Sequence, residues 1–90
     1  MNSVHILVSG QVQGVLFRQN TKAKAEKLGL TGWVRNTDAG KVEITTEGDK
    51  EKLDELIEWC RKGPLFAKVG DISVEWQDST NEHSTFEILY

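Results

Sequence analysis

Residues 10–18, which read GQVQGVLFR, place two glycines ahead of an arginine. An alternating apolar run precedes this segment, and residues 19–28, which lack Gly and Pro, follow it. The segment therefore links an expected strand to an expected helix. Backbone N–H groups at a helix N-terminus have no intrahelical partner and carry the positive end of the helix dipole. With Arg18 at the start of that helix, the segment is suited to binding an anion such as phosphate.

The distribution of charge agrees with an anion site. All 14 acidic residues follow Ala25, whereas Arg18, Lys22 and Lys24 precede it, although the whole chain has a formal net charge of −3. Charge and spacing alone leave a second interpretation open. In it, Gly10 and Gly14 only shape a turn, and Arg18 is a solvated surface residue.

Length and composition limit the remaining functions. The 90 residues suffice for one domain, and a hydrophobic content of 38% indicates a folded chain. A net charge of −3 argues against general binding to nucleic acid or to an anionic membrane, and no apolar run approaches the roughly 18 residues of a membrane span. The N-terminus lacks a signal-peptide pattern, Cys60 has no partner for an internal disulfide, and the two His are not spaced as metal ligands. We therefore expect a metal-free cytoplasmic protein and, without a long heptad pattern, a monomer.

Periodicity predicts the elements that position residues 10–18. Strands are expected at 4–9, 30–36, 41–47, 69–77 and 86–89, with a four-residue turn at 37–40. One helix is expected over 18–28, with Gly29 as its C-terminal cap. A second helix is expected from the N-cap Asp49 to Gly63. Its apolar face is the clearest amphipathic signal in the chain and consists of Leu53, Leu56, Ile57 and Cys60.

The order strand, helix, strand, strand, helix, strand, strand fits a ferredoxin-like α+β sandwich. Two helices are expected on one face of an antiparallel sheet of four to five strands. A right-handed crossover makes the first two strands parallel, so the loop after the first strand and the hairpin after the second lie at the same end of the sheet. We expect Arg18 and Asn36 to face one another there across a small pocket.

Two segments resemble the signatures of the acylphosphatase family. Residues 10–18 are similar to the first signature, G-x-V-Q-G-V-x-F-R, and residues 32–42, which read GWVRNTDAGKV, are similar to the second, which ends at Gly48. The similarity extends over nearly the whole chain, so residues 1–90 are expected to form a single acylphosphatase-like domain. The chain departs from the family at Leu16, where many members have Gly, and at Gln11, where a basic residue is common. If position 16 requires a positive φ, Leu costs about 1–2 kcal/mol there.

The resemblance implies hydrolysis of the carboxyl–phosphate bond of small acyl phosphates by in-line attack of a water, without cofactor or metal. Inorganic phosphate would be both product and competitive inhibitor. Arg18 would bind the phosphate group and Asn36 would orient the water, and neither motif contains a general base. The expected phosphate-binding loop consists of Gln13, Gly14, Val15, Leu16, Phe17 and Arg18.

Other residues have structural interpretations. Cys60 is expected in the core, His5 away from it and Trp33 on the open face of the sheet. Thr21 and Thr37 are expected to cap or pack, with hydrogen bonding to the site as the alternative. Tyr90 either places its terminal carboxylate near Arg18 or belongs to a frayed end.

Two other function classes stay open at this point. The first is a binding module, because this fold also serves as a small-molecule regulatory domain or an RNA-binding domain. The chain lacks the aromatic strand motif and the basic surface that RNA binding needs. The second is a catalytically weak member of the same family that senses phosphate or carboxyl-phosphate groups, with Leu16 as the reason for weak catalysis.

Overall fold

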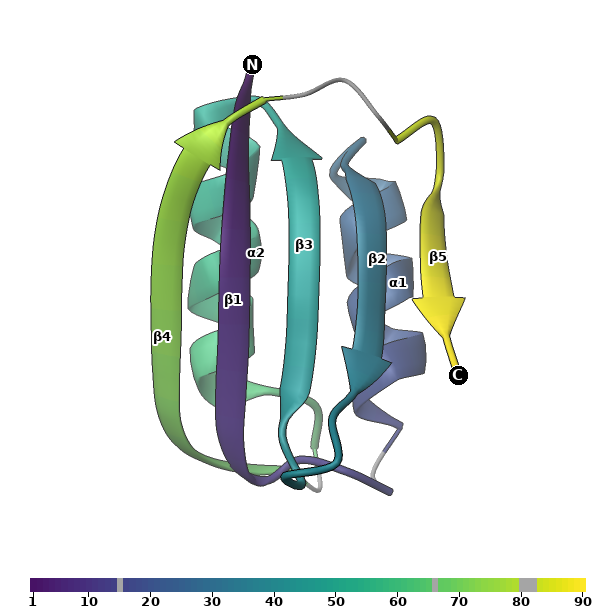
Figure 1. Ribbon diagram of the computed structural model, residues 1–90, viewed down its shortest axis with the longest axis vertical. Coiled ribbons are helices and arrows are strands. Elements are labelled where there is room, and N and C mark those ends of the chain that lie inside the picture. Colours follow the sequence, from purple (N-terminus) through teal and green to yellow (C-terminus); the bar gives the residue numbers. More distant parts are fainter. Residues whose placement is uncertain (15, 66, 80–82) are drawn as a thin grey trace.

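The computed structural model describes residues 1–14, 16–65, 67–79 and 83–90. In these residues, five strands and two helices follow one another in the predicted order (Figure 1). Their bounds are β1 (Asn2–Gln11), α1 (Phe17–Lys27), β2 (Thr31–Asn36), β3 (Val42–Gly48), α2 (Lys50–Lys62), β4 (Lys68–Asp78) and β5 (Phe86–Leu89). Most predicted boundaries agree within two residues. No described helix is long and apolar enough to cross a membrane.

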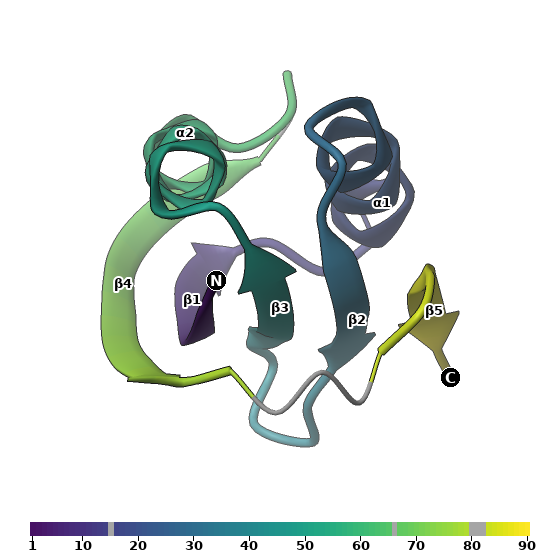
Figure 2. The ribbon, with the colours of Figure 1, turned by 90° about the horizontal axis from the view of Figure 1, so that it is seen from above.

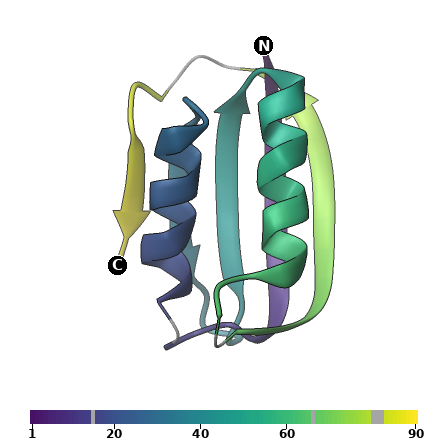
Figure 3. The same ribbon diagram turned by 180° about the vertical axis from the view of Figure 1, so that it is seen from behind.

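The strands form one sheet in the order β4-β1-β3-β2-β5. Both helices cover the same face of this sheet, as the view from above shows (Figure 2). From behind, α1 and α2 lie side by side across the strands (Figure 3). The expected ferredoxin-like α+β sandwich is therefore confirmed.

The fifth strand corrects the expectation of an antiparallel sheet. β1, β3, β2 and β4 pair antiparallel, but β5 pairs parallel with β2, with Gly32 opposite Phe86 and Arg35 opposite Leu89. The reason is topological: β4 ends and β5 begins at the same end of the sheet (Figure 1). β5 must then run opposite to β4 and β3, which is the direction of β2.

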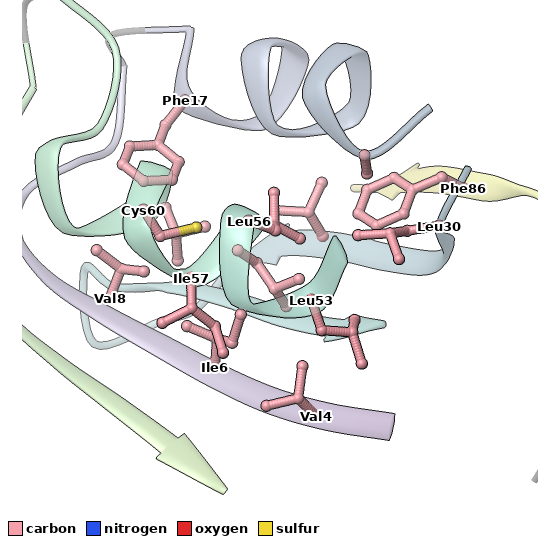
Figure 4. Close-up of a cluster of buried hydrophobic side chains, with 14 of the residues drawn as sticks. Val4, Ile6, Val8, Phe17, Leu30, Leu53, Leu56, Ile57, Cys60 and Phe86 are labelled. Carbon is pink, nitrogen blue, oxygen red and sulfur yellow. The ribbon is translucent and has the colours of Figure 1, made fainter. Parts of the chain in front are cut away.

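The core lies between the sheet and the helices. Val4, Ile6 and Val8 of β1 alternate toward it and are fully buried. The predicted apolar face of α2 packs on them, with Leu53, Leu56, Ile57 and Cys60 buried (Figure 4). The weaker stripe of α1 buries Phe17, Thr21 and Ala25, and the Phe17 ring meets Trp59 edge-on at 5.5 Å between centroids. Cys60 is thus a core residue, as predicted.

Local signals at the element ends mostly act as expected. Gly29 has a φ of 73°, and the Leu30 N–H donates to Ala25 O at 2.9 Å, which closes α1 in a Schellman arrangement. Asp49 is the N-cap of α2, but its backbone carbonyl receives the bonds, from Lys52 N and Leu53 N at 3.0 Å each, and its side chain makes no capping bond to the described residues. The predicted turn at 37–40 is closed by Thr37 N donating to Lys41 O at 2.9 Å.

Candidate functional site

The loop after β1, the start of α1 and the end of β2 come together at one end of the sheet (Figure 1). These segments line a small pocket. Its volume is about 150 Å³. The described lining residues are Val12, Gly14, Leu16, Phe17, Arg18, Gln19 and Asn36. The structure therefore brings Arg18 and Asn36 to one pocket, although they come from different elements.

Four of the six residues of the predicted phosphate-binding loop line the pocket in the part of the chain that the structure describes. Gly14, Leu16, Phe17 and Arg18 line the pocket, whereas Val15 lies outside the described residues. Gln13 is not among the described lining residues. Its side-chain Nε2 instead donates to Thr37 O and to Lys41 O, both at 2.9 Å.

Sequence reasoning missed two lining residues, Val12 and Gln19. Val12 is fully buried, and it lies inside the first signature, which was the available signal. Gln19 follows Arg18 in the first turn of α1, where N–H groups without helical partners face outward. This position in the first turn could have identified Gln19 as a lining residue from the sequence.

The loop turns into α1 through left-handed backbone conformations. Gly14 has a φ of 74°, and Leu16, the N-cap of α1, has φ 61° and ψ 25°. Among the described residues Leu16 is the one non-glycine with a positive φ. Asn20 holds this conformation, since its backbone N and its Nδ2 both donate to Leu16 O, at 3.0 and 2.9 Å. The backbone at position 16 does have the positive φ that disfavours Leu, and the side chain stands 64% exposed at the pocket.

Electrostatics at the pocket favour an anion. Arg18 is the second residue of α1, and the first turn of this helix contains no acidic residue. Lys24 and Lys27 stand in the last turn, the end where the helix dipole favours cations. None of the described lining residues is a carboxylate, an imidazole or a thiol. The N–H groups of the first turn of α1, which have no intrahelical partner, and the guanidinium of Arg18 are therefore the donors suited to an anionic ligand.

Asn36 carries an unusual polar atom. It is the last residue of β2 and pairs with Val42 of β3. Its side-chain Oδ1 is buried and has no hydrogen-bond partner among the described residues. A buried acceptor without a donor costs about 1–3 kcal/mol. Oδ1 is therefore an unused hydrogen-bond acceptor on a residue that lines the pocket.

Tyr90 contacts Arg18 through its ring. The guanidinium carbon of Arg18 lies 4.9 Å from the ring centroid. The sequence left open whether the terminal carboxylate of Tyr90 lies near Arg18 or the end is frayed; the contact in the structure is a cation–π contact of the ring. The two threonines make local bonds: Thr21 Oγ1 donates to Phe17 O at 2.7 Å, and Thr37 Oγ1 accepts from Lys41 N at 3.1 Å.

The other titratable clusters lie elsewhere. His5 Nε2 and Arg35 Nε contact the Glu43 carboxylate at 2.7 and 2.6 Å, so His5 faces away from the core as predicted. Hydrogen bonding from His5, with a further contribution from Arg35, holds the pKa of Glu43 below its usual value. Burial raises the pKa of Cys60 to about 12. In the described residues, no three His, Cys, Asp or Glu side chains are grouped to hold a metal ion.

A wider groove of about 570 Å³ is lined mainly by α2, with Lys24 from α1. Its described lining residues are Lys24, Asp54, Glu55, Glu58, Trp59 and Lys62. Three carboxylates and two ammonium groups there carry opposite charges, so this groove does not select an anion. The smaller pocket is the better candidate site.

Comparison with known proteins decides the family. The family model described as acylphosphatase matches residues 4–88. This chain belongs to the acylphosphatase family. An acylphosphatase of Pelotomaculum thermopropionicum is 50% identical over 86 residues, which cover 96% of this chain and 94% of the relative. An acylphosphatase of Methylococcus capsulatus is 48% identical over 89 residues, covering 99% and 97%.

A solved acylphosphatase structure has the same fold. The crystal structure of acylphosphatase from Bacillus subtilis is 43% identical and superposes with a TM-score of 0.96, and the match covers 100% of both chains. The resemblance seen in the two sequence signatures is thus confirmed. Both signatures contribute to the pocket, the second through Asn36. The first contributes Val12, Gly14, Leu16, Phe17 and Arg18.

Proposed function

We propose that this protein hydrolyses the carboxyl–phosphate bond of small acyl phosphates, using Arg18 and Asn36 as catalytic residues. One observation carries the proposal: Arg18 and Asn36 line one pocket at the N-terminus of α1, and Asn36 Oδ1 is a buried acceptor without a partner among the described residues. Membership of the acylphosphatase family supports the same reaction.

The phosphoryl group is bound by the first signature. The guanidinium of Arg18 has a planar fork of donors that matches two phosphate oxygens. Backbone N–H groups of the loop and of the first turn of α1, among them those of Gly14, Leu16 and Phe17, provide further donors. The loop proposed from sequence, residues 13–18, keeps this role through its backbone. Because the reacting group is already anionic, positioning and electrostatic stabilisation supply most of the catalysis.

Asn36 orients the nucleophile. A water that donates a hydrogen bond to Asn36 Oδ1 is held on the side of the pocket formed by β2, with a lone pair free to attack. The water oxygen bonds to phosphorus in line with the leaving carboxylate, and the bond between phosphorus and the carboxylate oxygen breaks. The carboxylate leaves as a weak base and needs no acid. The proton of the water passes to a phosphate oxygen, which gives carboxylate and inorganic phosphate.

Several finer properties belong to the same proposal. No step calls for a metal or cofactor, and inorganic phosphate competes for the same donors as the substrate. Residues 1–90 act as a single domain and as a monomer, which sedimentation would test. A free, buried Cys60 is in keeping with a reducing compartment such as the cytoplasm.

The test is hydrolysis of benzoyl phosphate with a chelator present. Arg18→Ala and Asn36→Ala are each expected to lower kcat/KM by roughly 10²–10³. Arg18→Ala also loses inhibition by inorganic phosphate, whereas Asn36→Ala keeps it, because the side chain of Arg18 binds the phosphate group and that of Asn36 does not. Arg61→Ala, at an exposed position in the last turn of α2, is the matched control and keeps full activity.

A second candidate function rests on Leu16. Its left-handed conformation places a strained, exposed side chain at the pocket, and such strain is compatible with a member that binds phosphate without turning over substrate. A folded wild type that binds phosphate by calorimetry but hydrolyses no benzoyl phosphate would favour this sensing function and contradict the enzyme. Appearance of activity in Leu16→Gly would then attribute the loss to Leu16.

A further inference from the structure

We propose that the side chain of Gln13 is a positioning residue that sets Asn36 at the correct distance from the phosphate-binding loop. This inference rests on the proposed function. Its starting point is the pair of bonds from Gln13 Nε2 to Thr37 O and Lys41 O, both 2.9 Å long. They join segments that lie 24 and 28 residues apart in the chain.

The two acceptors belong to the connection that directly follows Asn36. Thr37 N donates to Lys41 O at 2.9 Å, and Lys41 N donates to Thr37 Oγ1 at 3.1 Å, so the connection is closed on itself. Asn36 itself pairs with Val42 at the start of β3. Fixing Thr37 and Lys41 therefore fixes the backbone from which the Asn36 side chain projects.

Gln13 stands one residue before Gly14, which lines the pocket. Its side chain thus connects the phosphate-binding side of the pocket to the water-orienting side. A primary carboxamide suits the task, because its nitrogen carries two hydrogens for two carbonyl acceptors. A carboxylate would repel both carbonyls, and a thioether would leave them without this donor.

Loss of this connection should affect one catalytic step more than the other. Arg18 and the loop N–H groups bind phosphate from one side, and they keep their places when only the Gln13 side chain changes. Asn36 is on the other side, and a displacement of about 1 Å between reacting groups lowers rates by up to about 10²-fold. We expect kcat to fall while phosphate affinity is retained.

The experiment compares Gln13→Met, a replacement of similar length without donors, with the wild type on benzoyl phosphate. The expected result is a fall in kcat of about 10- to 100-fold, with the phosphate inhibition constant changed by less than about 2-fold. Gln77→Met, at an exposed position of β4, is the matched control and leaves both values unchanged. Equal kcat in Gln13→Met and wild type would overturn the inference, and so would a parallel loss of phosphate inhibition.

A double-mutant cycle separates positioning from general structural support. If Gln13 acts through Asn36, Gln13→Met in the Asn36→Ala background lowers kcat by less than about 2-fold further. Losses that multiply would show that Gln13 acts independently of Asn36 and would overturn the inference. Should Gln13→Met unfold at the assay temperature, Gln13→Asn serves in the same cycle, because it keeps the donors on a side chain one methylene shorter.

Failure of the inference is distinguishable from failure of the proposed function. A wild type without turnover overturns the proposed function, and this inference falls with it. A wild type that is active, is inactivated by Asn36→Ala and yet tolerates Gln13→Met overturns the inference alone.

Discussion

The aromatic ring of Tyr90 packs against the guanidinium of Arg18, with 4.9 Å between the guanidinium carbon and the ring centroid. Tyr90 follows β5, which pairs with β2, whereas Arg18 is in the first turn of α1. β5 therefore brings a side chain to the residue proposed to bind phosphate. A cation–π contact attracts the guanidinium through its charge, so it is compatible with N–H donation to a phosphate group.

We predict that Tyr90→Ala weakens phosphate inhibition by about 2- to 5-fold, the equivalent of an exposed cation–π contact of about 0.5–1 kcal/mol. The side chain is 95% exposed, which places the contact at the weak end of the range. Phosphate inhibition is expected to weaken in Tyr90→Ala because Arg18 loses the contact that holds its side-chain rotamer. Tyr90→Phe keeps the ring and should keep wild-type inhibition. Tighter phosphate binding in Tyr90→Ala would show instead that the ring competes with the ligand.

Leu16→Gly is predicted to stabilise the fold by about 0.5–1 kcal/mol. Leu at φ 61° costs about 1–2 kcal/mol, and part of the relief is offset by the greater chain entropy of glycine in the unfolded state. Urea unfolding measures the difference. Leu65→Gly is the matched control, since Leu65 is 88% exposed and does not have a positive φ. An equal effect at the two positions, or a loss of stability in Leu16→Gly, would contradict the explanation from backbone strain.

The Glu43 cluster predicts a loss of stability in acid. The carboxylate receives hydrogen bonds from His5 and Arg35, and its pKa in the folded protein lies below the usual value of 4.5. A lowered folded-state pKa contributes stability that is present above pH 4.5 and disappears as the pH falls through the folded value. Glu43→Gln should therefore be less stable than wild type at neutral pH, and the difference should shrink below pH 4.5.

Urea unfolding from pH 3 to pH 7, at roughly one-unit steps, checks this prediction. Glu87→Gln, at an exposed position of β5, is the control and should follow the wild-type curve at every pH. A constant difference between Glu43→Gln and wild type across the range would show that the loss comes from packing and not from proton linkage.

Cys60 is predicted to be unreactive in the native protein. The thiol is buried, and its pKa of about 12 keeps it protonated at pH 8, whereas the thiolate is the nucleophile. An aromatic disulfide reagent should modify Cys60 only as fast as the protein opens, and at once in denaturing urea. Rapid native-state modification at pH 8 would mean that the helix–sheet interface opens far more often than its packing suggests.

Local sequence patterns were sufficient for the elements and for the core. The spacing of Leu53, Leu56, Ile57 and Cys60 predicted the buried face of α2, because a helical repeat aligns such positions on one side. Alternation in β1 predicted its buried face for the corresponding reason. These patterns depend only on neighbours along the chain, so the buried face of an element can be predicted before the surface that packs against it is known.

The sequence by itself also determined the family, through two signatures at a separation that the fold turns into one pocket. Only the tertiary structure decided that β5 runs parallel to β2, that position 16 has a positive φ, and that Tyr90 meets Arg18 with its ring. It also revealed the Gln13 bonds to the connection after Asn36. Each of these depends on which strand edge the chain returns to or on a rotamer chosen between distant segments. Tertiary packing determines these features, and the local periodicity of the sequence does not predict them.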